Sequence, residues 1–139
     1  MTQADPQTRD FSERLIAYEA KGNKSSGVNA PLAFHAFEKL RPPLATLMGH
    51  TGFSALLMRA LMLASADVAW LRAVRVSADG ILQGSDELAA QLDPEEIVEG
   101  KVVLLARLLG LLVAFIGEGL TLRLMREVWP NLSLNGEKK

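Results

Sequence analysis

Two stretches of the chain are apolar on nearly every side, and they dominate its pattern of hydrophobic and polar positions. In residues 53–73 the few polar positions, wound as a helix, are scattered around it instead of gathering on one face. Residues 94–129 contain two dense apolar runs, 102–105 and 111–116. A helix that is apolar nearly all round is enclosed on most sides. The pattern therefore predicts a core pair of helices, 53–73 packed along 94–129.

The second of these helices has clear start and stop signals. Asp93 is placed as an N-cap and Pro94 suits the first helical position, where its missing N–H has no intrahelical partner. Glu96 follows the cap by three residues, as in a capping box, and Pro130 cannot continue a helix. The sequence predicts one long helix over 94–129. Glycines mark the places where it is expected to bend: Gly100, Gly110 and 117–119.

The remaining elements are shorter. Phe11, Leu15 and Tyr18 form one stripe of a short amphipathic helix over residues 10–20, followed by a linker rich in Gly, Ser and Asn. Pro42 and Pro43 fall inside an apolar stripe, so we expect a helix to about residue 40 and a second over 42–48. A short helix is expected over 86–92. Residues 74–82 fit either a short hairpin or an irregular loop.

These elements define an all-α fold, a small bundle of four to five helices around a long C-terminal helix, with at most one short β-hairpin near 74–82. The expected organisation is a flexible N-terminal arm with a short amphipathic helix (1–30), a helical domain (31–130) and a polar tail (131–139). The pattern leaves open whether the helix of the arm docks on its own chain or on a partner.

Composition narrows the class of protein. With 139 residues, 49% of them hydrophobic and 22% charged, the chain has room for one core and is not disordered. A net charge of −1 argues against nucleic acid as a partner. The chain has no cysteine and its first ten residues do not resemble a signal peptide, so a cytoplasmic protein is expected. The run 102–116 contains Arg107 and is shorter than the roughly 20 residues of a membrane span, so none is expected.

Candidate catalytic and metal-binding residues have plainer explanations. His35 and Glu38 share a helix face and His50 lies nearby, but the Glu-x-x-His order of bundle metal sites is reversed and unrepeated. Thr51 and Ser54 lie near His50 without the strand–turn–helix context of a nucleophile, so capping and turn formation explain them. No phosphate-binding glycine loop is present. We expect no catalytic residue, metal or cofactor, and no enzyme.

Arg107 and Glu118 are charges on an otherwise apolar helix. Eleven residues is close to three turns, so both point the same way, about 16 Å apart along the axis and too far to pair with each other. In an antiparallel two-fold dimer, Arg107 would approach Glu118 of the partner subunit. Pairing within the chain, with Asp67 and Arg59 as the partners, is the alternative.

Gly110 and Gly117 lie seven residues apart on roughly the same face, as a close helix–helix crossing requires. The predicted interface therefore comprises five residues: Arg107, Gly110, Ala114, Gly117 and Glu118.

The function that follows is a non-enzymatic helical interaction or assembly module that self-associates, most simply as a homodimer, with another protein as a further partner class. The alternative is a carrier or sensor that binds an apolar small molecule between the long helices. Four methionines would suit its adaptable lining: Met48, Met58, Met62 and Met125. Peripheral membrane association is less favoured, because no basic face is present.

Overall fold

The computed structural model describes residues 6–23, 35–77, 80–84 and 86–130, and this part of the chain is mostly helical. The helices are α1 (Pro6–Asn23), α2 (His35–Ser65), the 3-10 helix η2 (Ala69–Ala73), α3 (Asp86–Ala90), α4 (Pro94–Ile116) and α5 (Glu118–Val128). The strands are β1 (Arg75–Val76) and β2 (Leu82–Gln83). The predicted linker and polar tail fall largely or wholly outside the described residues, so the expected division into arm, domain and tail stays a prediction.

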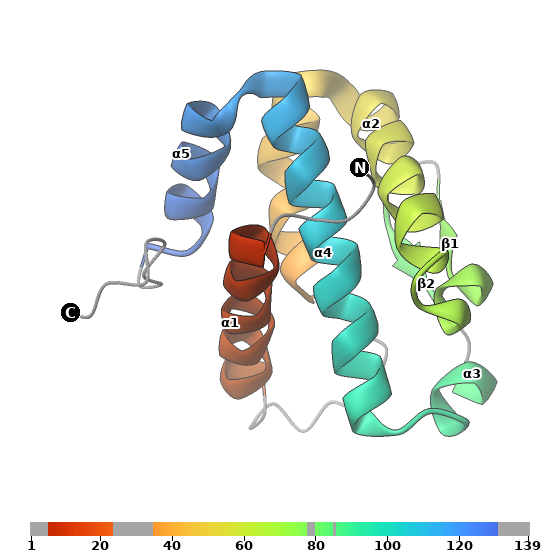
Figure 1. Ribbon diagram of the computed structural model, residues 1–139. Coiled ribbons are helices and arrows are strands. Elements are labelled where there is room, and N and C mark those ends of the chain that lie inside the picture. Colours follow the sequence, from red (N-terminus) through yellow and green to blue (C-terminus); the bar gives the residue numbers. More distant parts are fainter. Residues whose placement is uncertain (1–5, 24–34, 78–79, 85, 131–139) are drawn as a thin grey trace.

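Helix α4 occupies the centre of the bundle (Figure 1) and packs against α1, α2 and α5. Every residue from 102 to 109 is buried, which means that neighbours cover all sides of this part of the helix. The sequence expectation of an enclosed helix is therefore confirmed for these turns. Helix α1 lies beside the N-terminal half of α4 and does not reach its C-terminal end. α5 folds back beside the C-terminal half.

The expected long C-terminal helix is broken, and the longest helix is α2 instead. The break falls at Gly117, with φ 93° and ψ 156°. Non-glycine residues essentially never adopt this backbone conformation, and no helix continues through it. Gly100 and Gly110, the other expected bends, remain helical within α4.

Helix α2 also departs from expectation. It runs through Pro42 and Pro43 and bends at Gly49, whose φ of 82° and ψ of 157° are not helical. The two prolines remove hydrogen bonds to the carbonyls four residues earlier, which belong to Glu38 and Lys39. Both of these residues are exposed, so water can donate hydrogen bonds to the freed carbonyl oxygens.

The helix expected over 53–73 ends at Ser65 instead, as the last part of α2. Val68 then takes an extended conformation, with φ −125° and ψ 106°, before η2 begins.

Residues 36–65 of α2 form the one described segment that is long and apolar enough to cross a membrane. This is a weak indication, since the core helix of a bundle meets the same test. Here the segment bends at Gly49 and packs against α4.

The hairpin left open by the sequence is present. Strands β1 and β2 are antiparallel, with Arg75 opposite Gln83 and Val76 opposite Leu82. Ser54 on α2 holds the turn, because its hydroxyl donates to the Ser77 carbonyl oxygen at 3.0 Å. This contact gives the buried Ser54 hydroxyl a structural role.

Helix α1 contains the expected amphipathic helix and extends it at both ends. Its buried apolar residues are Phe11, Leu15 and Ile16, whereas Tyr18, expected in the stripe, is 38% exposed. α1 docks on α4 of its own chain. The chain therefore has an intramolecular strap of the kind that the sequence left as one of two alternatives.

Candidate functional site

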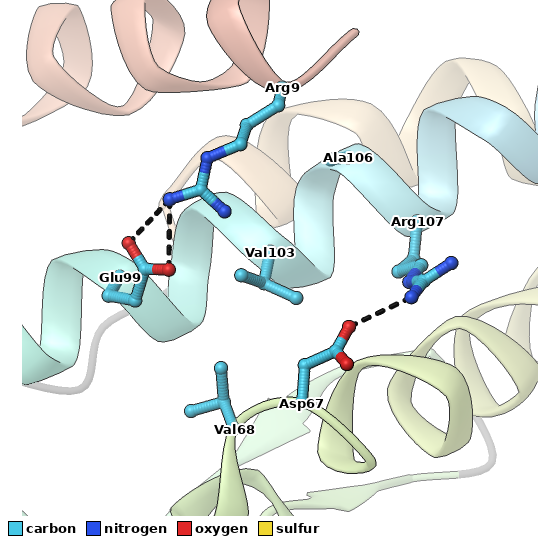
Figure 2. Close-up of a pocket in the computed structure, with 7 residues that line it drawn as sticks. All are labelled: Arg9, Asp67, Val68, Glu99, Val103, Ala106 and Arg107. Carbon is cyan, nitrogen blue, oxygen red and sulfur yellow. Dashed lines mark hydrogen bonds and ion pairs between the residues drawn. The ribbon is translucent and has the colours of Figure 1, made fainter. Parts of the chain in front are cut away.

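A cavity of about 230 Å³ lies between α1, α4 and residues 67–68, just after the end of α2 (Figure 2). Its lining comprises Arg9, Asp67, Val68, Glu99, Val103, Ala106 and Arg107. The four α4 residues follow the 4-3-1 spacing of one helix face. The cavity has an apolar wall between two ion pairs, one at each side.

The first ion pair joins α4 to the chain after α2. Nη2 of Arg107 donates to Oδ2 of Asp67 at 2.8 Å. The Arg107 side chain is only 9% exposed, whereas Asp67 is about half-exposed. Removing a charge from water without a counter-charge is costly, so this pairing explains how α4 carries an arginine through the core. Of the two pairings that the sequence left open for Arg107, the structure has the intrachain one.

The second ion pair fastens α1 to α4. Nη2 of Arg9 donates to both carboxylate oxygens of Glu99, at 2.7 and 2.9 Å, and its Nε donates to Glu13 at 3.3 Å. The hydrogen bonds to Glu99 are the main reason that the pKa of Arg9 is raised above its ordinary value, so the guanidinium stays charged. The pair is half in water and so contributes about 1 kcal/mol or less to stability. Its main effect is to fix the register of α1.

Sequence reasoning missed this cavity, and it did not single out Arg9 or Glu99. The methionines expected to line an apolar cavity are elsewhere: Met58 and Met62 are exposed, Met48 is partly buried and Met125 is buried in the core. None of the four lines the cavity between α1 and α4. The cavity offers two guanidinium groups, two carboxylates and a short apolar wall, and these groups are suited to bind a small polar ligand.

The five predicted interface residues divide into two groups. Arg107 is buried and paired, whereas Gly110, Ala114, Gly117 and Glu118 are exposed. A Cβ added at Gly110 or Gly117 would meet no atom of the described residues within 4 Å, so none of the described helices crosses closely there. No ion pair between Glu118 and Arg59 is found within the described ranges, and both residues are exposed. Their part in an interface with a second copy stays a prediction.

The last turn of α4 presents apolar side chains to water. Residues 113–115 are all exposed, and three consecutive helical positions cover about 200° of the helix circumference. Phe115 is 72% exposed, as is Met62 on α2. From the sequence, residues 111–116 are expected in the core, because no local feature distinguishes them from the enclosed residues 102–109.

Metal chemistry has little basis in the described part of the chain. There, no three or more His, Asp and Glu side chains are placed to hold a metal ion. His50 and Thr51 are exposed just after the bend in α2, and the side chain of His35 lies outside the described residues. Comparison of the chain with protein-family models, with curated proteins and with solved structures gives no match.

Proposed function

We propose that this protein is a non-enzymatic helical assembly module that self-associates, most simply as a homodimer, through the C-terminal end of α4. The supporting observation is the exposed apolar last turn of α4, with Phe115 at its end. Burying a phenylalanine side chain stabilises an assembly by about 1.5–3 kcal/mol. Monomers rarely leave a contiguous apolar patch in water, whereas an interface removes it.

The exposed residues around Phe115 suit a two-fold contact. Gly110, Ala114 and Gly117 have little or no side chain, so a second helix approaches the backbone of α4 closely there. A two-fold axis brings the same surface together from both subunits, so one patch supplies both halves of the interface. Arg107 takes no direct part, because it is held by Asp67 inside the chain.

Two valines of α4 provide a matched test of this surface. Val113 lies in the last turn and is 39% exposed, while Val98 lies near the start and is 45% exposed. The double variant Val113→Gln/Phe115→Gln is expected to lower the mass in solution toward that of one chain, and Val98→Gln to leave it unchanged. All three residues are exposed, so thermal unfolding of dilute protein should change little.

Sedimentation velocity of the wild type and both variants measures this directly. Equal dissociation by Val98→Gln, or an unchanged mass of the double variant, would show that the end of α4 is not the interface.

The alternative, a carrier or sensor of a purely apolar molecule between the long helices, has less support. The cavity that exists is flanked by four charged side chains, and the methionines do not line it.

A further inference from the structure

The side chain of Arg107 is nine-tenths buried, yet its guanidinium makes a single hydrogen bond to another described side chain, from Nη2 to Asp67. An arginine carries five N–H donors. Donors sealed in a protein interior without acceptors are costly. No nitrogen of Arg107 is fully buried without a hydrogen-bond partner, because the residue lines the cavity. The N–H groups that Asp67 does not occupy are therefore available to an acceptor that enters from the cavity.

Asp67 and Glu99 define what kind of acceptor fits. Asp67 holds Arg107 in place, and Glu99 does the same for Arg9 at the other side of the cavity (Figure 2). The four side chains sum to no net charge. A dianion such as phosphate would meet two carboxylates as well as two guanidinium groups. A monoanion that binds the open edge of one guanidinium meets less repulsion.

The apolar wall indicates the rest of the ligand. Val68, Val103 and Ala106 lie between the two ion pairs. The cavity volume of about 230 Å³ corresponds to roughly eight waters at about 30 Å³ each. A carboxylate with a short branched hydrocarbon chain has a similar number of non-hydrogen atoms.

We propose that this cavity is a binding site for a small monocarboxylate with a short apolar body. The carboxylate accepts charge-assisted hydrogen bonds from the N–H groups of the Arg107 guanidinium that Asp67 leaves free. The hydrocarbon chain covers Val68, Val103 and Ala106. Asp67 is a positioning residue that orients the guanidinium. The site precedes Gly110 on α4, so the proposal does not rest on self-association.

The test uses the full chain labelled with ¹⁵N and two matched compounds, 4-methylpentanoate and its primary amide. The acid is expected to shift the Nε–H signal of Arg107 and the backbone amide signals of Val68 and Val103 in a saturable way. The amide has the same size and no charge, and is expected to leave the Arg107 signal unmoved. Equal shifts from both compounds, or no shift from the acid at about 10 mM, a concentration that detects even weak binding, would overturn the proposal.

Two variants locate the site. Arg107→Lys keeps a positive charge beside Asp67 but loses the planar fork, so the affinity for the acid is expected to fall by about tenfold or more. Arg123→Lys, at an exposed position of α5, is the matched control and should bind as the wild type does. If Arg107→Lys does not fold, Val68→Phe fills the cavity from a partly exposed position and should abolish binding. Undiminished binding by whichever of these variants folds would refute the site.

Discussion

Gly100 is the point at which Trp70 of η2 reaches the central helix. The Trp70 ring lies against Gly100, and its Nε1 donates to the Glu96 carbonyl oxygen at 3.0 Å. A Cβ at position 100 would run into the indole ring, whereas one at Gly110 would meet nothing within 4 Å. The two glycines of one helix thus differ in their surroundings: the Trp70 ring packs on Gly100, whereas the space around Gly110 is open.

The two glycines make a matched prediction. Gly100→Ala is expected to lower the free energy of unfolding by about 1–3 kcal/mol, because the Trp70 ring must move and its hydrogen bond is strained. Gly110→Ala should raise it by about 0.5–1 kcal/mol, because alanine is the better helix former. Urea unfolding of dilute protein measures both. Equal effects of the two substitutions would contradict the packing of Trp70 on α4.

Lys101 lies next to Gly100, and burial lowers the pKa of its ammonium group below the ordinary 10.5. The folded state therefore releases this proton at a lower pH than the unfolded state does. Between the two pKa values the unfolded state binds more protons, so stability rises with pH there.

Between pH 7 and about pH 10, the free energy of unfolding of the wild type is expected to rise by more than the free energy of unfolding of Lys101→Met does. Lys39→Met, at an exposed position of α2, serves as the control. If Lys101→Met and Lys39→Met follow the same pH dependence, burial of the Lys101 amine does not contribute to stability.

Single-residue features were predictable where they are local. The backbone N–H of Asp93 donates to Glu96 Oε1 at 2.9 Å, as the capping-box spacing indicates. Asp67 was one of two partners named for Arg107, because a buried arginine needs an acid. The Arg9–Glu99 pair was not predictable, since its members are 90 residues apart and nothing local to either specifies the other.

The bend within α2 and the bend between α4 and α5 are both formed by a glycine in the same backbone conformation. Gly49 and Gly117 have nearly the same dihedral angles, φ 82° and ψ 157° against φ 93° and ψ 156°. Both bends lie at the same end of the bundle (Figure 1). At each position an added Cβ would meet no neighbouring atom within 4 Å. Any effect of a side chain there comes from the backbone alone.

Gly49→Ala and Gly117→Ala are each expected to cost about 1–3 kcal/mol of stability, because an L-residue is strained at these angles. Gly110→Ala, in a helical conformation with equally open space, is the control and should not be destabilising. Thermal unfolding of the three variants at one low concentration distinguishes them. Wild-type stability of both bend variants would mean that the bends do not require glycine.

Hydrophobic periodicity was enough to find the helices but not their breaks. Gly100, Gly110 and Gly117 look alike in the sequence, but only Gly117 breaks the helix: Trp70 covers Gly100, and Gly110 remains in regular helix. Pro42 and Pro43 predicted a helix break that α2 does not have, because their exposed carbonyl partners tolerate the loss of a hydrogen bond. The sequence left residues 74–82 open between a hairpin and a loop, because the two-residue strands are too short to decide between them.

Across the whole molecule, the distribution of burial along α4 connects fold to function. Residues 102–109 are enclosed, whereas 113–115 are exposed. α1 does not extend along the last turns of α4 (Figure 1), so the same apolar pattern forms core over 102–109 and exposed surface over 113–115. The sequence indicated more apolar helix than one small bundle can cover, but not which part stays uncovered. The cavity beside Arg107 depends on three segments meeting, and no local pattern specifies that.

Absolute mass by multi-angle light scattering on a sizing column, over a range of concentrations of the full chain, tests the assembly proposal most directly. One chain has a mass of 15.1 kDa. We expect twice this value for a dimer joined at the ends of α4, persisting on dilution until the patch around Phe115 is substituted. A mass of one chain at every concentration would contradict self-association and leave the exposed end of α4 to a different partner.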